Sequence, residues 1–115
     1  MASPIVISPF ADLNTGLSGS CTIVGGVATT TYVDYAVDGT ATATGGVALS
    51  TGVTCTVKTS YGTWGGASGG LPGAVAVAAG TVRIPVWALS GLRVCASANT
   101  LYHPNTPRSY TQPNC

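Results

Sequence analysis

Apolar and polar side chains alternate along much of this chain, and the alternation is clearest at residues 53–58. Val53, Cys55 and Val57 occupy every second position there, with two threonines and a lysine between them. Successive side chains of a β-strand point to opposite faces, so this pattern is typical of a strand with one buried and one solvated face. No segment shows the 3.6-residue apolar period and end caps of a helix. We therefore predict an all-β protein.

Further segments carry strand patterns, and glycine-rich breaks separate them. Seven or eight short strands at this spacing predict one antiparallel, immunoglobulin-like β-sandwich domain over residues 1–115, with a small closed barrel as the alternative. Residues 99–115 contain three prolines and are expected to form a tail or a loose hairpin turning near 103–105. The expected strands lie at 5–7, 20–24, 29–37, 40–44, 53–58, 74–79, 81–87 and 92–98.

The strongest local turn signal is Asp38-Gly39, which follows a β-branched and aromatic run. An Asp-Gly pair supplies the two positive-φ positions of a type I′ turn, so a β-hairpin is predicted over 29–44. Alternation assigns Val33, Tyr35 and Val37 to the core.

Charged residues make up only 6% of the chain, which has no glutamate and a net charge of +1. Solvated faces must therefore be covered mainly by hydroxyl, amide and glycine groups. Such a surface has little self-repulsion and can stack on copies of itself or on a neutral polymer at low desolvation cost. We expect a protein partner, either another chain or a second copy.

Two classes of partner are disfavoured by the sequence. The basic residues are scattered singly, so no stripe is available to neutralise a run of phosphates, and nucleic-acid binding is not expected. The longest apolar run, 74–79, is far shorter than the roughly 20 residues of a membrane helix. Membrane insertion is not expected either.

Four cysteines without a C-x-x-C spacing indicate two disulfides and a secreted protein, the alternative being free or metal-binding thiols in the cytosol. Residues 1–4 lack the features of a signal peptide, so we expect a mature chain with an added initiator Met. Strand parity directs Cys21 and Cys55 into the core and Cys95 to the solvated face. The favoured pairs are Cys21 with Cys55 and Cys95 with Cys115.

An alternative pairing comes from a resemblance to antibody domains. The sequences around Cys55 and Cys95 resemble the two bridged strands of those domains, which implies Cys55 with Cys95 and Cys21 with Cys115.

The inventory of acid-base groups is short, with three aspartates and one histidine. Asp34 and Asp38 share strand parity but would lie roughly 13 Å apart along a strand, and the turn already accounts for Asp38. His103 is expected to be an exposed turn residue, and no Gly-x-Ser-x-Gly motif is present. We predict no catalytic residues, no metal site and no cofactor.

The longest predicted loop, residues 61–73, carries three side chains that are candidates for ligand binding. Tyr61 and Trp64 would stack on a neutral sugar ring or anchor a partner, with Leu71 beside them. The alternative is that Trp64 folds back as a lid over the end of the sandwich. Trp87 follows an apolar run and is expected in the core or as a plug at a strand edge.

Four short motifs carry a resemblance to a group of bacterial proteins: Thr54-Cys55-Thr56-Val57, Gly-Gly-Leu-Pro-Gly at 69–73, residues 78–82 and residues 94–97. Over residues 20–100 the chain resembles small exported, uncharacterised β-sandwich proteins of high-GC Gram-positive bacteria. The resemblance implies export and a β-sandwich, and it implies no activity.

The sequence favours a secreted, non-catalytic structural or interaction module that self-associates through uncharged faces or an edge strand on a cell or particle surface. A carbohydrate- or small-ligand-binding domain using the aromatic, glycine-rich loop is the second hypothesis. An enzyme is the third, because acids and bases are few.

Overall fold

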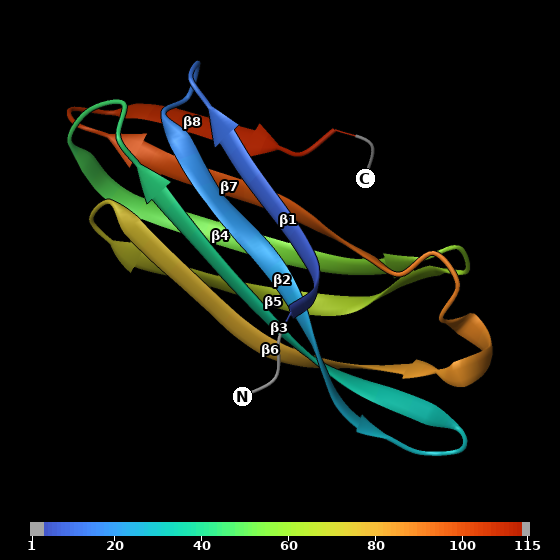
Figure 1. Cartoon of the computed structure of the whole chain (residues 1–115). Coiled ribbons are helices and arrows are strands. Elements are labelled where there is room, and N and C mark those ends of the chain that lie inside the picture. The colour runs from blue at the N-terminus through green and yellow to red at the C-terminus, as the bar shows by residue number, and fades with distance from the viewer. Residues whose placement is uncertain (1–3, 114–115) are drawn as a thin grey trace.

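The chain forms an elongated sandwich of two antiparallel β-sheets, 52 × 27 × 19 Å along its principal axes (Figure 1). The structure is a computed structural model and describes residues 4–113. Within this range eight strands and one short 3₁₀ helix are present, so the predicted all-β sandwich is confirmed. The elements are β1 (Pro4–Asp12), β2 (Leu17–Ala28), β3 (Tyr32–Ala43), β4 (Ala48–Thr59), β5 (Gly62–Pro72), β6 (Val75–Pro85), η1 (Val86–Ala88), β7 (Arg93–Tyr102) and β8 (Thr106–Thr111).

Sheet 1 has the strand order β1-β2-β3-β6, and sheet 2 has the order β5-β4-β7-β8. In immunoglobulin lettering, β2 to β8 correspond to strands A, B, C, C′, E, F and G, because β5 pairs with β4 and not with β6. Strand β1 is added beside A at the edge of sheet 1. The predicted immunoglobulin-like order is therefore present, with one additional strand.

The core follows the alternation seen in the sequence. On β4, Val53, Cys55 and Val57 are at most 2% exposed. On β3, Tyr35 and Val37 are buried and Val33 packs against the core, as predicted. Burial of these alternating residues excludes water between the sheets and is the main stabilising term of the fold.

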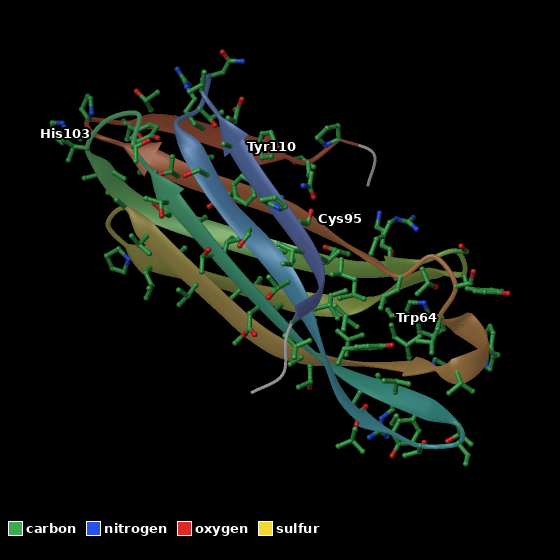
Figure 2. The ribbon with its side chains drawn as sticks, viewed as in Figure 1. Trp64, Cys95, His103 and Tyr110 are labelled. Atoms are coloured by element: carbon green, nitrogen blue, oxygen red, sulfur yellow. A yellow bond between two sulfur atoms is a disulfide. The ribbon has the colours of Figure 1, made fainter. Side chains whose placement is uncertain are left out.

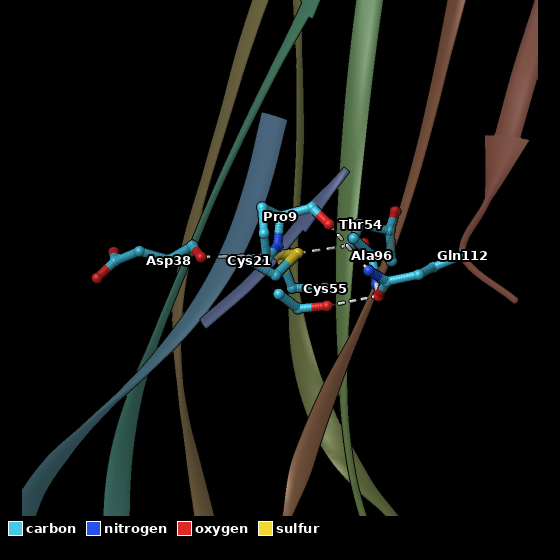
Figure 3. The surroundings of a disulfide bond; sticks show 8 residues. Pro9, Cys21, Asp38, Thr54, Cys55, Ala96 and Gln112 are labelled. Carbon is cyan, nitrogen blue, oxygen red and sulfur yellow. Dashed lines mark hydrogen bonds between the residues drawn. A yellow bond between two sulfur atoms is a disulfide. The ribbon is translucent and has the colours of Figure 1, made fainter. Parts of the chain in front are cut away.

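A disulfide between Cys21 of β2 and Cys55 of β4 joins the two sheets near the middle of the sandwich (Figure 3). The Cα atoms are 5.8 Å apart, and both residues are at most 1% exposed. The pair predicted from strand parity is therefore correct, and the alternative of Cys55 with Cys95 is wrong. The bridge joins strands A and C, whereas antibody domains join B and F.

Cys95 has the outer-face parity predicted for it, because its neighbours Val94 and Ala96 are the buried ones, but at 7% exposure it is not solvated as expected. The chain after β8 continues beside β7 at the edge of sheet 2. The Gln112 N–H donates to the Ala96 carbonyl at 3.0 Å in this segment. Among the described residues no cysteine is free, and Cys115, the second half of the predicted Cys95–Cys115 pair, lies outside them.

The predicted hairpin turn at Asp38-Gly39 is wrong, because both residues lie in the middle of the continuous strand β3. Gly39 faces the disulfide, and a Cβ atom there would lie 2.4 Å from Cys55 Sγ. The glycine is needed for this close approach and not for a positive φ. The chain turns instead before β3, near Thr29, and after it, at Gly45-Gly46.

The predicted loop at 61–73 is also wrong, because residues 62–72 form strand β5, which pairs with β4 over its whole length. Its glycines permit close packing of bare backbone. A Cβ at Gly66 would lie 1.8 Å from the Cys55 carbonyl oxygen, and one at Gly69 would lie 2.0 Å from the Val77 carbonyl oxygen on β6 of the other sheet. Gly25-Gly26 and Gly80 likewise lie inside strands and do not end them, so the strands are longer than predicted.

The two long sides of the sandwich are closed differently. On one side, β5 and β6 approach through backbone at Gly69. On the other, Gln112 bridges the sheets, because its side chain accepts from Ser8 Oγ at 2.6 Å and donates to the Pro9 carbonyl at 3.2 Å. Phe10 stacks on Tyr110 beside it, with ring centroids 5.4 Å apart. The expected edge strand at 5–7 is part of β1, which continues through Pro9 to residue 12.

Residues 99–111 form a hairpin, the second of the two arrangements expected for this segment. Strand β8 pairs with the end of β7 after a turn at His103–Asn105. Tyr102, at the end of β7, is buried and donates its hydroxyl to the Thr15 carbonyl at 2.7 Å. The same hydroxyl accepts from the Gly45 N–H at 2.9 Å. These bonds fix the turns at this end of the sandwich to each other.

Candidate functional site

Trp64 lies over one end of the sandwich, at the opposite end from His103 (Figure 2). Its side chain is half-buried and packs against the core, and its indole N–H donates to Thr59 Oγ1 at 2.9 Å. This is the lid arrangement that the sequence left open as an alternative. The Trp64 ring is fixed by its packing against the core and by the hydrogen bond of its N–H, so it stabilises this end of the core. Little of the ring is available to a ligand.

Trp87 is 65% exposed, so its predicted place in the core is wrong. Pro85 ends β6, and the following 3₁₀ turn rotates the chain so that Ala88 takes the buried position and Trp87 faces solvent. Tyr61, 59% exposed, meets the Trp87 ring edge to face with 5.4 Å between centroids. We call Tyr61 and Trp87 the aromatic corner.

The structure does not bring the three predicted ligand-binding residues together. Leu71 lies near the far end of β5, seven residues and therefore roughly 23 Å from Trp64 along the strand. It borders a shallow hollow of about 330 Å³ that Ser50, Gly52 and Asn99 also line. Tyr61 and the half-buried Trp64 both contact the Trp87 ring, Trp64 with 6.2 Å between ring centroids, whereas Leu71 has no part in this group.

The titratable groups are dispersed over the described part of the chain. Asp34 accepts two hydrogen bonds from the Arg83 guanidinium, at 2.8 and 3.2 Å, and these bonds lower the pKa of the Asp34 carboxyl. Arg83 also lies 3.8 Å above the Tyr32 ring centroid. His103 is an exposed turn residue. Among residues 4–113, no group of three His, Cys, Asp or Glu side chains is placed to hold a metal ion.

The outer face of sheet 1 consists mainly of apolar and hydroxyl side chains in rows across the strands. Ile7 and Val77 are 61% and 53% exposed on the two edge strands, with polar side chains such as Thr22 and Thr40 on the strands between. Two further large side chains, Ile5 and Val75, are 54% and 51% exposed. The rows are Ile7–Thr22–Asp38–Ala79, Pro9–Ser20–Thr40–Val77 and Ala11–Ser18–Thr42–Val75. We call this surface face 1.

The outer face of sheet 2 carries rows of hydroxyl side chains and bare backbone. A hollow of about 310 Å³ lies over the glycines of β5, lined among others by Thr54, Thr56, Gly66 and Ser68. One complete row of hydroxyls crosses the sheet: Ser68–Thr54–Ser97–Thr111. We call this surface face 2.

Comparison of the chain with protein-family models, with curated proteins and with solved structures gave no match. Within residues 4–113, no helix is long and apolar enough to cross a membrane. The geometry of the two faces and of the aromatic corner is therefore the basis for any functional proposal.

Sequence reasoning missed the Asp34–Arg83 pair and the exposure of Trp87. The pair depends on the register of β3 against β6, in which residue 34 lies opposite residue 83. Pro85 directly before Val86-Trp87 was a usable signal, because a strand pattern is not expected to continue unchanged through a proline.

Proposed function

We propose that this protein is an exported, non-catalytic structural module that associates with further copies of itself through its sheet faces. Face 1 is the observation that carries the proposal. Four β-branched side chains, Ile5, Ile7, Val75 and Val77, are each more than half exposed on its two edge strands. Solvent-exposed apolar rows on a surface with few charges favour protein contacts.

Export is supported by the Cys21–Cys55 bridge. A fully buried disulfide between the sheets is typical of proteins that fold and remain in an oxidising compartment. In a chain of this size such a bridge contributes a large part of the stability.

Association through the faces is favoured over pairing of strand edges. Pro9 removes a backbone donor from β1, the edge strand of sheet 1. On the other side of the sandwich, β5 and β6 lie against each other, as the Gly69–Val77 contact shows. Both arrangements hinder the addition of a further strand.

The experiment is sedimentation velocity of the oxidised protein at increasing concentration, with one charged variant on face 1 and a matched control. Val77→Asp places a carboxylate among the apolar rows and is expected to abolish association. Val47→Asp makes the same change at a turn residue that is 70% exposed and lies outside both faces, and it should leave association unchanged. A wild-type protein that stays monomeric up to about 1 mM would overturn the proposal, since binding weaker than this has no structural use.

The aromatic corner supports a second candidate function, binding of a neutral glycan. Tyr61 and Trp87 meet nearly at a right angle, with 84° between their planes, so a sugar ring can stack on one ring while its edge touches the other. Trp87→Ala is expected to abolish binding on a glycan array. The control is the neighbouring Val86→Ala, which also removes an exposed apolar side chain and should leave glycan binding intact. Loss of binding in both variants would contradict this candidate, and so would a wild-type protein that binds no glycan.

A further inference from the structure

The few charges of this chain are divided between the two sheets. Three carboxylates and one guanidinium lie on sheet 1, which gives it a net charge of −2. Three cations lie on sheet 2 and give it +3. The groups are Asp12, Asp34, Asp38 and Arg83 on sheet 1, and Lys58, Arg93 and Arg108 on sheet 2.

Asp38 is the charge that face 1 presents to solvent. Its neighbours Val37 and Gly39 point into the sandwich, so its side chain points outward, away from the disulfide (Figure 3). In the register across the sheet it lies between Thr22 and Ala79, both neutral. Among residues 4–113, no cationic side chain lies within ion-pair distance of it, whereas the charge of Asp34 is balanced by Arg83.

Lys58 and Arg93 are the corresponding charges of face 2. They are register partners on β4 and β7, and the buried Val57 and Val94 beside them show that both face outward. Within the described part of the chain neither forms an ion pair. The Arg93 guanidinium donates to the Gly91 carbonyl at 3.3 Å, which holds it near the surface of the sheet.

The two faces also differ in relief. Val75 and Val77 project from face 1 along its β6 edge, whereas face 2 is hollowed over the β5 glycines around Gly66. A projecting β-branched side chain of one copy can enter the hollow of another. Two copies of face 1 would instead place projecting side chains and carboxylates against each other, and two copies of face 2 would place four cations together.

We infer that the copies stack face 1 on face 2, with Asp38 of one molecule opposite Lys58 and Arg93 of the next. This inference rests on the proposed function and specifies its geometry. A contact between two different faces is heterologous, so an assembly of any length still presents a free face 1 at one end and a free face 2 at the other. The product is an open filament and not a closed dimer.

The size of the faces sets the strength of each contact. The four strands of sheet 1 have 9 to 12 residues, and about 4.8 Å between strands with roughly 3.3 Å per residue gives a face of about 700 Å². This is below the roughly 800 Å² per partner of a standard interface. Each contact is therefore weak, and filaments form only at high protein concentration.

The test is an exchange of charges, read by sedimentation velocity at low ionic strength. Asp38→Lys alone and Lys58→Glu/Arg93→Glu together each place like charges across the contact, and each is expected to raise the apparent dissociation constant about 10-fold or more. The triple variant carries both changes and restores opposite charges, so it should associate within about 3-fold of wild type. An equimolar mixture of the two separate variants should also associate. Circular dichroism of every variant checks that the β-sandwich is intact.

Two outcomes would overturn this geometry and leave self-association standing. If Lys58→Glu/Arg93→Glu associates like wild type, the cations of face 2 do not take part in the contact. If the triple variant associates no better than the separate variants, the charges do not face each other. A monomeric wild type would remove the proposed function as well.

Discussion

Replacement of Gly39 by alanine tests whether the disulfide determines the sequence of β3. The added methyl would lie 2.4 Å from Cys55 Sγ and 3.6 Å from Cys21 Sγ. The first contact is more than 1 Å shorter than an ordinary contact of nonbonded carbon and sulfur, so the bridge or the strand must move. Overpacking of this kind costs about 1–3 kcal/mol in a well-packed core.

The cost is expected to depend on the sulfur atoms. In a Cys21→Ala/Cys55→Ala background the methyl of Gly39→Ala enters space that the sulfurs have left. There the substitution should be neutral or slightly stabilising, because alanine restricts the unfolded chain more than glycine does. The coupling free energy of the cycle is therefore about 1–3 kcal/mol. Loss of the bridge itself, which closes a loop with a sequence separation of 34, costs about 4 kcal/mol.

The assay is urea unfolding of the four proteins in one sulfate-containing buffer, which strengthens burial and keeps the weakest variant folded. Gly25→Ala is the control, because nothing lies within 4 Å of a Cβ at that position in β2. Its free energy of unfolding should change by less than about 0.5 kcal/mol. An equal cost of Gly39→Ala with and without the disulfide would refute the reasoning.

Two further variants test polar contacts. Tyr102→Phe leaves the Gly45 N–H and the Thr15 carbonyl without their partner, and it should lower the free energy of unfolding in urea by about 1–3 kcal/mol; no change would mean that water replaces the hydroxyl. Asp34→Asn removes the ion pair with Arg83. Because the folded pKa of Asp34 is lowered, its contribution is complete above the ordinary value of 3.8 and is lost as the pH falls through the folded pKa. The variant should therefore melt below wild type at pH 7, and the difference should become smaller as the pH falls below 3.8; a difference that is independent of pH would contradict this assignment.

Alternation was sufficient to predict the class of fold and one disulfide. It depends only on which side chains avoid water, and this is why Val53, Cys55 and Val57 were assigned correctly to the core. For Cys95 the same argument gave the correct face but not the exposure. Parity assigns a side chain to one face of a sheet, whereas its exposure depends on what the rest of the fold places there.

The wrong turn at Asp38-Gly39 and the wrong loop at 61–73 have one physical cause. A glycine is required at a positive φ, and it is equally required where another chain segment approaches closely. Gly39 and Gly66 belong to the second kind, and the atoms that they approach belong to other strands. Local sequence does not contain those atoms, so the two uses of glycine could not be distinguished before the strands were assembled.

The candidate surfaces were less accessible to sequence reasoning than the fold. The low charge of the chain pointed to self-association, but the separation of Asp38 from Lys58 and Arg93 onto opposite faces follows from which strands join which sheet. The aromatic corner needed the 3₁₀ turn after Pro85, which changes the direction of Trp87.

The unequal closure of the two long sides has a consequence for how such a chain can vary over generations. Where β5 meets β6, main chain touches main chain, and any side chain added at Gly69 would force the layers apart. Where Gln112 spans the gap, other polar residues can take over its bonds one by one. Substitutions should therefore accumulate along the β1–β8 side of the sandwich and be rare at the glycines of the β5–β6 side. Related chains should keep these glycines even where their surface residues differ.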